Sequence, residues 1–225
     1  MISVIIRTKN EQEWIRQCLV SVFSQVGVQF EVVVVDNESS DDTLSIVKEF
    51  PVKLINITQD DWSYGRALNK GIAASSGEYL VCLSGHCFPV NQHWLLHMLS
   101  NFSDSYVAGV YGRQEPICST SIYDKRDMWN TLGVEKKVQN KDPFFHNANS
   151  MLKRSIWARF PFDEQVSGVE DRIWAKQILS KGYKIVYEPL ASVYHPHGLN
   201  QVADQRRCAR VIDVIEKNRL NRSVK

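Results

Sequence analysis

Apolar positions in the first 90 residues follow two patterns that alternate along the chain. Short unbroken apolar runs predict buried strands at residues 2–7, 30–35, 52–57 and 78–83. Between these runs, apolar residues recur at helical spacing and predict helices over residues 11–25, 39–49 and 65–74. Strands that are apolar throughout and are separated by helices indicate a mainly parallel central sheet, flanked by helices on both faces. We therefore expect an α/β fold.

The pattern becomes less regular after residue 90. We expect a helix at 94–101 and a strand at 107–113, whereas the polar residues 117–141 have no clear assignment. Residues 149–157, 168–181 and 183–187 resume the α/β alternation. Because the sequence shows no internal repeat and no linker-like segment, we expect a single domain over residues 1–225. It would have a regular half at 1–90, an irregular half at 91–200 and a basic helix or tail at 201–225.

Composition and charge narrow the class of protein. A chain of 225 residues that is 44% hydrophobic and 23% charged has enough apolar material for one large core. Its formal net charge of +2 gives no reason to expect a nucleic-acid partner. No apolar run approaches the roughly 20 residues that span a bilayer. Since Met1 leads directly into the first strand without a signal-like segment, we expect a cytoplasmic protein.

Basic residues gather near the end of the chain, between Arg206 and Lys225. Apolar residues at 211, 212, 214 and 215 run beside them. This mixture favours a terminal helix that docks on the domain and exposes a solvated basic face. The alternative is a peripheral contact with the inner face of a membrane.

Polar side chains follow three of the predicted strands, at residues 7–10, 36–42 and 84–87. Sheets of this class bind ligands beyond the carboxyl ends of their strands. The turn at residues 8–11, Thr-Lys-Asn-Glu, has none of the glycines of a dinucleotide fingerprint or a P-loop. Asp36 is a candidate for hydrogen bonds to a base or ribose, although its position alone also fits a turn cap.

The five cysteines, at 18, 82, 87, 118 and 208, are odd in number and scattered. They favour free thiols in a reducing compartment. Cys82 and Cys87 bracket His86, but no second pair of ligands at metal spacing accompanies them. We therefore do not expect a zinc site here.

Several motifs, in a fixed order over almost the whole chain, resemble those of the family 2 glycosyltransferases, which have the GT-A fold. They are Ser3-Val-Ile-Ile-Arg-Thr-Lys-Asn-Glu11, Val33-Val-Val-Asp-Asn-Glu-Ser-Ser-Asp-Asp-Thr43, Gly65-Arg-Ala-Leu-Asn-Lys-Gly71, Asn147-Ala-Asn-Ser150, Pro161-Phe-Asp-Glu164 and Glu170-Asp-Arg-Ile-Trp174. The order and spacing of the motifs carry the resemblance, not any one of them. The chain is most similar to rhamnosyltransferase-like members, which build bacterial capsule, O-antigen and other surface polysaccharides.

The resemblance implies transfer of a sugar, with inversion, from a nucleoside-diphosphate donor of the UDP or dTDP type to a hydroxyl of a glycan or lipid-linked glycan. Residues 1–90 would bind the nucleotide, and residues 91–200 would hold the acceptor and the catalytic groups. The donor-side residues that it implies are Thr8, Asn10, Asp36, Arg66 and Asn69. Taken alone, Arg66 fits a solvated helix surface equally well.

On the acceptor side, the resemblance assigns the general base to the acidic pair, with Asp171 as the first candidate and Glu170 as the second. The dipole of the predicted helix explains one acidic residue at its start without any catalytic role. Further acceptor-side candidates are Asn147, Asn149 and Trp129, and Trp62 is an aromatic residue that fits a sugar-binding cleft.

One departure from the family pattern concerns the metal. Family members usually end the fourth strand with Asp-x-Asp, but this chain has Ser84, Gly85 and His86 there. Imidazole suits Mn²⁺ better than Mg²⁺. We therefore formulate two hypotheses: His86 ligates an Mn²⁺-like ion together with His195 or His197, or these side chains replace the metal as donors to phosphate.

Two rival functions remain open at this point. A nucleotidyltransferase would need a glycine-rich basic loop after the first strand, which residues 8–11 lack. A non-catalytic sugar-nucleotide-binding module with a degenerate metal site fits the missing Asp-x-Asp, but it does not explain the intact Glu170-Asp171 pair.

Overall fold

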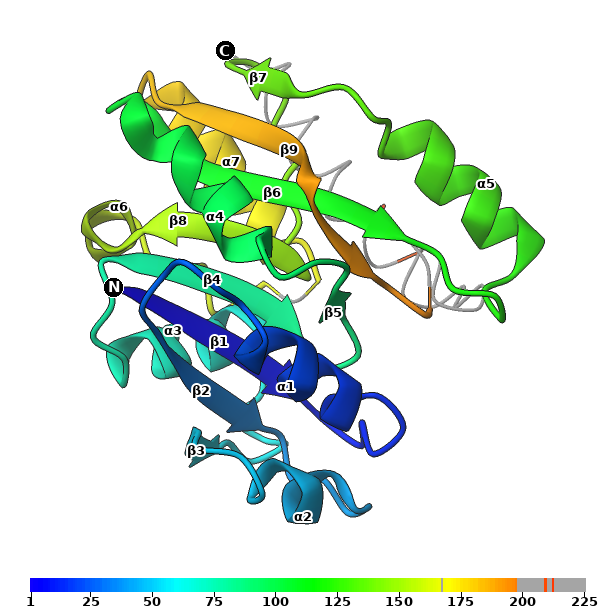
Figure 1. Ribbon diagram of the computed structural model, residues 1–225. Helices are drawn as coiled ribbons and strands as arrows, with labels where there is room; N and C mark the ends of the chain where they lie inside the picture. The colour runs from blue at the N-terminus through cyan, green and yellow to red at the C-terminus, as the bar shows by residue number, and fades with distance from the viewer. Residues whose placement is uncertain (167, 198–208, 210–211, 213–225) are drawn as a thin grey trace.

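The computed structural model describes residues 1–166, 168–197, 209 and 212 (Figure 1). The expected basic helix or tail at 201–225 therefore lies almost entirely outside the described residues. Within them, nine strands form one sheet in the order β3-β2-β1-β4-β8-β6-β9-β5, and β7 pairs with β9. None of the described helices is both long enough and apolar enough to cross a bilayer.

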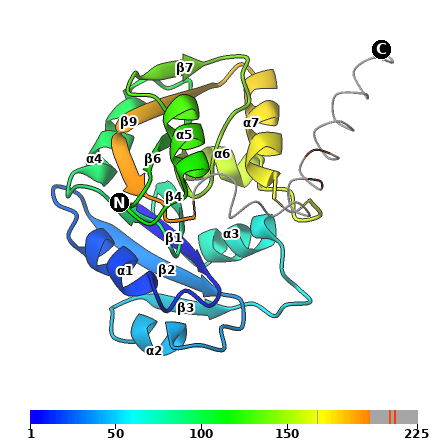
Figure 2. The same ribbon diagram turned by 90° about the vertical axis from the view of Figure 1, so that its right-hand side faces the viewer.

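The first half of the chain forms the regular α/β unit that the sequence predicts. Its strands are β1 (Ile2–Thr8), β2 (Phe30–Asp36), β3 (Lys53–Asn56) and β4 (Tyr79–Ser84), and they pair in parallel. The helices between them are α1 (Ile15–Phe23), α2 (Thr43–Val47) and α3 (Tyr64–Ala73). Figure 2 shows α1 and α3 on opposite sides of β1 and β2.

Alternate side chains of β1 enter two different cores, which explains why the strand is apolar throughout. Val4 and Ile6 pack with α1, whereas Ile5 packs with α3. The α1 helix begins at Ile15, four residues later than expected, because residues 12–14 form a turn. This turn keeps Glu11 at the edge of the sheet, where its amide nitrogen donates to the Thr43 hydroxyl over 2.7 Å.

The second half adds a mixed set of strands to β4. They are β5 (Phe88–Pro89), β6 (Val107–Glu115), β7 (Lys137–Gln139), β8 (Asn149–Lys153) and β9 (Lys184–Tyr194). β8 runs antiparallel to β4 and β6, and β9 runs parallel to β6. The expected strand at 183–187 thus continues to Tyr194, past a register shift opposite Gly112 and Gln114.

The remaining helices cover this part of the sheet. They are α4 (Trp94–Leu99), the 3₁₀ turn Ser100–Ser103, α5 (Ile122–Thr131), α6 (Arg154–Arg159) and α7 (Glu170–Ser180). α4 shares its core with α1, and α7 shares its core with α3. The unassigned segment 117–141 contains α5, which buries only Asp124 and Met128 and so has no apolar stripe to find.

The close approach of β6 to β9 gives a stability prediction at Gly112. A Cβ atom there would lie 1.8 Å from the Ala191 carbonyl oxygen and 2.4 Å from Asn149 Nδ2. Because both are held in the core, we expect Gly112→Ala to destabilise the fold by about 2–3 kcal/mol, which lowers the melting temperature by roughly 5–10 °C. Gly133→Ala is the matched control, since nothing described lies within 4 Å of the added Cβ. Equal melting temperatures for the two variants would refute this account of the β6–β9 contact.

Candidate active site

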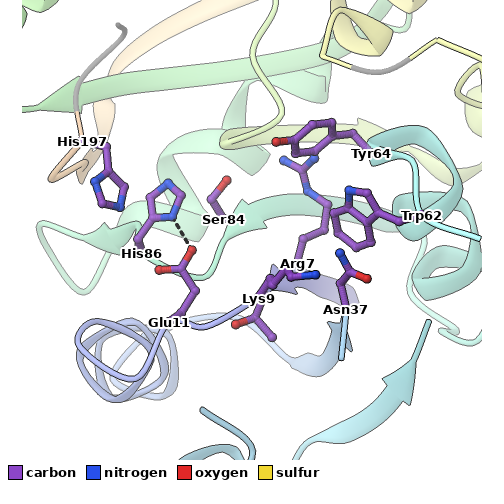
Figure 3. A pocket seen from close by; sticks show the side chains of 10 residues that line it. Arg7, Lys9, Glu11, Asn37, Trp62, Tyr64, Ser84, His86 and His197 are labelled. Atoms are coloured by element: carbon purple, nitrogen blue, oxygen red, sulfur yellow. Dashed lines mark hydrogen bonds and ion pairs between the residues drawn. The ribbon is translucent and has the colours of Figure 1, made fainter. Parts of the chain in front are cut away.

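The carboxyl ends of β1, β2 and β4 meet at one edge of the sheet and form a pocket of about 350 Å³ (Figure 3). Parallel pairing sets Arg7 beside Ser84 and Thr8 beside Asp36. The lining residues are Arg7, Thr8, Lys9, Glu11, Asn37, Trp62, Tyr64, Ser84, His86 and His197. The pocket therefore lies where the topology of the sheet places a ligand site.

A histidine cluster, defined as Glu11, His86, His195 and His197, lies at this pocket; Glu11, His86 and His197 line it, and His195 is buried behind His86. Glu11 Oε1 lies 2.7 Å from His86 Nδ1, and His86 Nε2 lies 3.1 Å from His195 Nε2. The rings of His86 and His195 stack at 5.0 Å, and the ring of His197 stands edge-on to His86 at 4.8 Å. Gln114 Oε1 holds the far nitrogen of His195 over 2.6 Å. The structure thus brings together the three histidines that the sequence singles out.

Two sets of side chains in this region have the spacing of metal ligands. Candidate ligand atoms of Glu11, His86 and His197 lie within 4.8 Å of one another, and so do those of His86, Cys87 and His195. Burial raises the pKa of the Cys87 thiol well above its usual value, which keeps the sulfur protonated. The set with Glu11 lines the pocket, whereas Cys87 is fully buried, so the first set is the better cation site.

Cys82 belongs to neither set. It packs in the core beneath α3, whereas Cys87 packs in the core beneath α1. The two thiols therefore face opposite sides of the sheet and cannot share an ion.

Burial together with the neighbouring His86 lowers the pKa of His197.

The acidic pair begins α7, as the sequence predicts. Glu170 is 3% exposed, and its Oε1 accepts from Asn147 Nδ2 over 3.4 Å. Asp171 Oδ2 accepts from the backbone nitrogen of Asn147, also over 3.4 Å. Burial and the neighbouring Glu170 raise the pKa of Asp171 to about 7. A carboxyl group with this pKa can exchange protons near neutral pH.

The donor-side candidates on β1 and β2 have different surroundings. Thr8 lines the pocket, and its buried hydroxyl has no hydrogen-bond partner among the described residues. Asp36 is fully buried, and its two oxygens accept from the Ser39 nitrogen over 2.9 Å and from the Ser39 hydroxyl over 2.5 Å. Asn10 is exposed, and its Oδ1 accepts from the Ser40 nitrogen. In this structure Asp36 therefore stabilises its own turn, and neither Asp36 nor Asn10 lines the pocket.

Arg66 and Asn69 connect α3 to the segment that precedes α7. Arg66 pairs with Asp61 over 3.3 Å and with Glu164 over 3.1 Å. Asn69 Nδ2 donates to Glu164 and to the carbonyl oxygen of Phe162, each over 2.9 Å. These contacts hold the loop before α7 and lie outside the pocket lining.

None of the acceptor-side candidates Asn147, Asn149 and Trp129 lines the pocket. Asn149 is fully buried, where it accepts from Trp94 Nε1 over 2.9 Å and donates to the carbonyl oxygens of Arg113 and Ala191. Trp129 is 53% exposed on α5. Trp62, by contrast, lines the pocket.

Five lining residues were not among the individual site candidates: Arg7, Lys9, Glu11, Asn37 and Tyr64, although the segments 7–10 and 36–42, marked from the sequence as strand ends, contain Arg7, Lys9 and Asn37. The rule about carboxyl ends of strands points to Lys9 and Asn37, which follow β1 and β2 directly. Tyr64 carries no comparable signal, because it begins α3 after an irregular stretch.

Residues 3–160 of the chain match the family model described as glycosyl transferase family 2. The chain belongs to this family. A curated relative, the O-antigen chain rhamnosyltransferase WbaN of Salmonella anatum, is 30% identical over 191 residues, which cover 77% of this chain and 58% of the relative. The family that the sequence motifs indicate is therefore confirmed.

Solved structures confirm the GT-A fold. The mannosyltransferase PcManGT from Pyrobaculum calidifontis, in complex with GDP-Man and Mn²⁺, has a TM-score of 0.75 at 24% identity and covers 96% of this chain. The structure of S. aureus TarS 1-349 in complex with UDP has a TM-score of 0.68 at 18% identity and covers 87%. The matched part of the chain spans 64% and 60% of these two structures, so it covers about three fifths of each.

Proposed function

We propose that this chain transfers a sugar from a nucleoside-diphosphate donor to an acceptor hydroxyl, with inversion, in the synthesis of a bacterial surface polysaccharide. The observation that carries the proposal is a pocket at the strand ends of a family 2 domain, whose lining residue Arg7 lies 3.7 Å from Glu170, next to the Asp171 carboxyl group with its pKa raised to about 7. The relatives that act on O-antigen support the same class of acceptor, a glycan or a lipid-linked glycan.

The two ends of the pocket suit the two parts of the donor. Thr8, Asn37 and Trp62 offer buried polar atoms and an aromatic ring, which suit a nucleoside. Glu11, His86 and His197 lie beyond Ser84, on the opposite side of the pocket in Figure 3, and suit the diphosphate. A UDP or dTDP donor remains our prediction. The related structures contain GDP-Man in one case and UDP in the other.

We propose that Glu11, His86 and His197 hold a divalent cation at the diphosphate. One carboxylate and two imidazoles form a donor set that suits Mn²⁺ better than Mg²⁺, and their candidate ligand atoms are close enough to share one ion. A bound cation would neutralise charge on the leaving diphosphate. The Mn²⁺ in the PcManGT complex supports this choice of metal.

In the proposed reaction, Asp171 accepts the proton of the acceptor hydroxyl. The oxygen then forms a bond to the anomeric carbon while the bond from that carbon to the diphosphate breaks on the opposite face. The nucleoside diphosphate leaves with the electron pair of the broken bond, and the configuration at the anomeric carbon inverts. Asn147 supports this step because it hydrogen-bonds both carboxyl groups of the acidic pair.

The raised pKa of Asp171 predicts the pH dependence of the reaction. Only the ionised carboxylate can accept the proton, so we expect kcat/KM to rise about tenfold per pH unit below pH 7 and to level off above it. Initial rates measured between pH 5 and pH 9 check this expectation. A profile that is flat from pH 5 to pH 8 would exclude Asp171 as the titrating base.

Release of nucleoside diphosphate tests the function itself. The protein would be incubated with UDP-, dTDP- and GDP-sugars and Mn²⁺, with and without a glycan extract as acceptor. We expect acceptor-dependent release from one donor class. Donor binding without any release, across all donors and acceptors tested, would instead favour the non-catalytic module.

A further inference from the structure

Arg7 is the arginine in the described lining of the pocket. An arginine side chain in the binding site of a sugar nucleotide would ordinarily be expected to bind the diphosphate, because phosphate oxygens attract guanidinium groups. The contacts of Arg7 point to a different role. In Figure 3 its guanidinium lies against Tyr64, on the side of the pocket away from His86 and His197.

The guanidinium is enclosed by protein on the side of α7. Its carbon lies 4.9 Å from the centre of the Tyr64 ring. Nη2 donates to the carbonyl oxygen of Asn147 over 3.4 Å, and Nη1 lies 3.7 Å from Glu170 Oε1. Nε and Nη1 are both buried and have no hydrogen-bond partner among the described residues. Arg7 is only 9% exposed, so little of it is open to a ligand.

We propose that Arg7 is a positioning residue that holds the acidic pair, Glu170 and Asp171, in place for catalysis, and that it is not the cation that binds the diphosphate. This inference rests on the proposed function, in which Asp171 is the general base.

The charge of Glu170 gives the first reason. A carboxylate that is 3% exposed needs a nearby cation, because an unpaired buried charge is strongly destabilising. Among the described ion pairs, Arg7 is the partner of Glu170. The two side chains come from β1 and α7, so their attraction fixes the start of α7 against the sheet.

Asn147 gives the second reason, because it contacts all three charged groups. Its carbonyl oxygen accepts from Arg7, its side chain donates to Glu170, and its backbone nitrogen donates to Asp171. A displacement of Arg7 would therefore move both carboxylates. Displacing a catalytic group by about 1 Å can cost on the order of 100-fold in rate.

The test separates nucleotide affinity from turnover. Arg7→Met, Arg7→Lys and Asp171→Asn would be compared with the native chain, and two quantities would be measured. These are the Kd for the nucleoside diphosphate of the active donor, and kcat at saturating donor. Arg16→Met is the matched control, because it also breaks an arginine–carboxylate pair, with Glu49, on an exposed surface.

We expect Arg7→Met to lower kcat by about 10- to 100-fold with the Kd within twofold of the native value. Arg7→Lys should recover part of the loss, since lysine keeps the charge but cannot stack as a planar group on Tyr64. Arg16→Met should change neither quantity. If Arg7→Met does not fold, Arg7→Met with Glu170→Gln removes the uncompensated charge, and we expect its kcat to lie below that of Glu170→Gln alone, with an unchanged Kd.

The opposite result overturns the inference. A Kd raised tenfold or more, with kcat unchanged at saturating donor, would make Arg7 a diphosphate-binding cation and would leave the proposed function intact. Failure of the proposed function looks different. In that case Asp171→Asn keeps near-native turnover, whatever the Arg7 variants do.

Discussion

Asp171→Asn is expected to lower kcat by about 1,000-fold, within the range usual for loss of a general base. The amide is nearly the same size as the carboxyl and can still accept from the Asn147 nitrogen, but it cannot take a proton. The affinity for the nucleoside diphosphate should stay within twofold, since Asp171 is not part of the pocket lining. Steady-state rates and nucleotide titrations check the two expectations separately.

The same substitution should stabilise the fold at alkaline pH. Burial and Glu170 raise the pKa of Asp171 to about 7, so ionisation of Asp171 opposes folding. The penalty is absent below the pKa of the unfolded chain, grows as the pH rises and is complete above about pH 7. We expect Asp171→Asn to be more stable than the native chain by about 1–2 kcal/mol at pH 8 and equal to it near pH 4.

Urea unfolding at the two pH values measures this difference. Glu135→Gln, at an exposed carboxylate after α5, is the control and should show no such dependence on pH. If Asp171→Asn is inactive and also less stable than the native chain at pH 8, the ionised Asp171 carboxylate stabilises the fold. That result would contradict the raised pKa on which its role as general base rests.

The second large loss of activity is expected from substitution of His86. His86→Ala removes a candidate cation ligand that contacts both Glu11 and His195, so we expect donor turnover to fall by about 100-fold. His86→Asp restores a carboxylate where family members usually have one. Because hard Mg²⁺ prefers oxygen ligands, this variant should recover activity with Mg²⁺, whereas the native chain should work better with Mn²⁺.

The experiment is a rate comparison in Mn²⁺, in Mg²⁺ and in chelator. His93→Ala is the control, because His93 is exposed at the start of α4 and its ring neighbour, His97, is outside the cluster. Native turnover that persists in chelator would replace the cation proposal with direct donation from the histidines to phosphate. Full activity of His86→Ala would contradict both versions.

The regular half of the fold could be predicted from the sequence, and the irregular half could be predicted only in part. Ile5 and Ile6 on β1 pack in the two cores on opposite faces of the sheet. An unbroken run of apolar residues predicts a strand that is buried on both faces in this way. The α5 helix could not be found in this way, because its two buried residues, Asp124 and Met128, form no apolar stripe. The end of β9 was missed because residues 189–192 of β9 interrupt its pairing between Gly112↔Glu188 and Gln114↔Val193, and a local sequence pattern does not show that pairing resumes after them.

The candidate site shows the same division. His86, His195 and His197 stand out by residue type, and the structure places them together. The assignment of Arg66 and Asn69 to the nucleotide stays a prediction, and their contacts with Glu164, far away in sequence, could not be predicted from their motif. Local patterns indicate the class of residue at a strand end. They do not indicate which long-range partner a polar side chain takes.

The most direct test of the central claim is a thermal-shift panel with UDP, dTDP, GDP and CMP, each with Mn²⁺, with Mg²⁺ and with chelator. A ligand at 100 times its Kd stabilises a protein by about 2.7 kcal/mol, which is roughly 5–10 °C for a domain of this size. We predict such a shift for one nucleoside diphosphate of the UDP or dTDP type, larger with Mn²⁺ than with Mg²⁺. A chain that melts cooperatively and shifts with none of the four nucleotides would contradict the assignment of the pocket to a nucleotide-sugar donor.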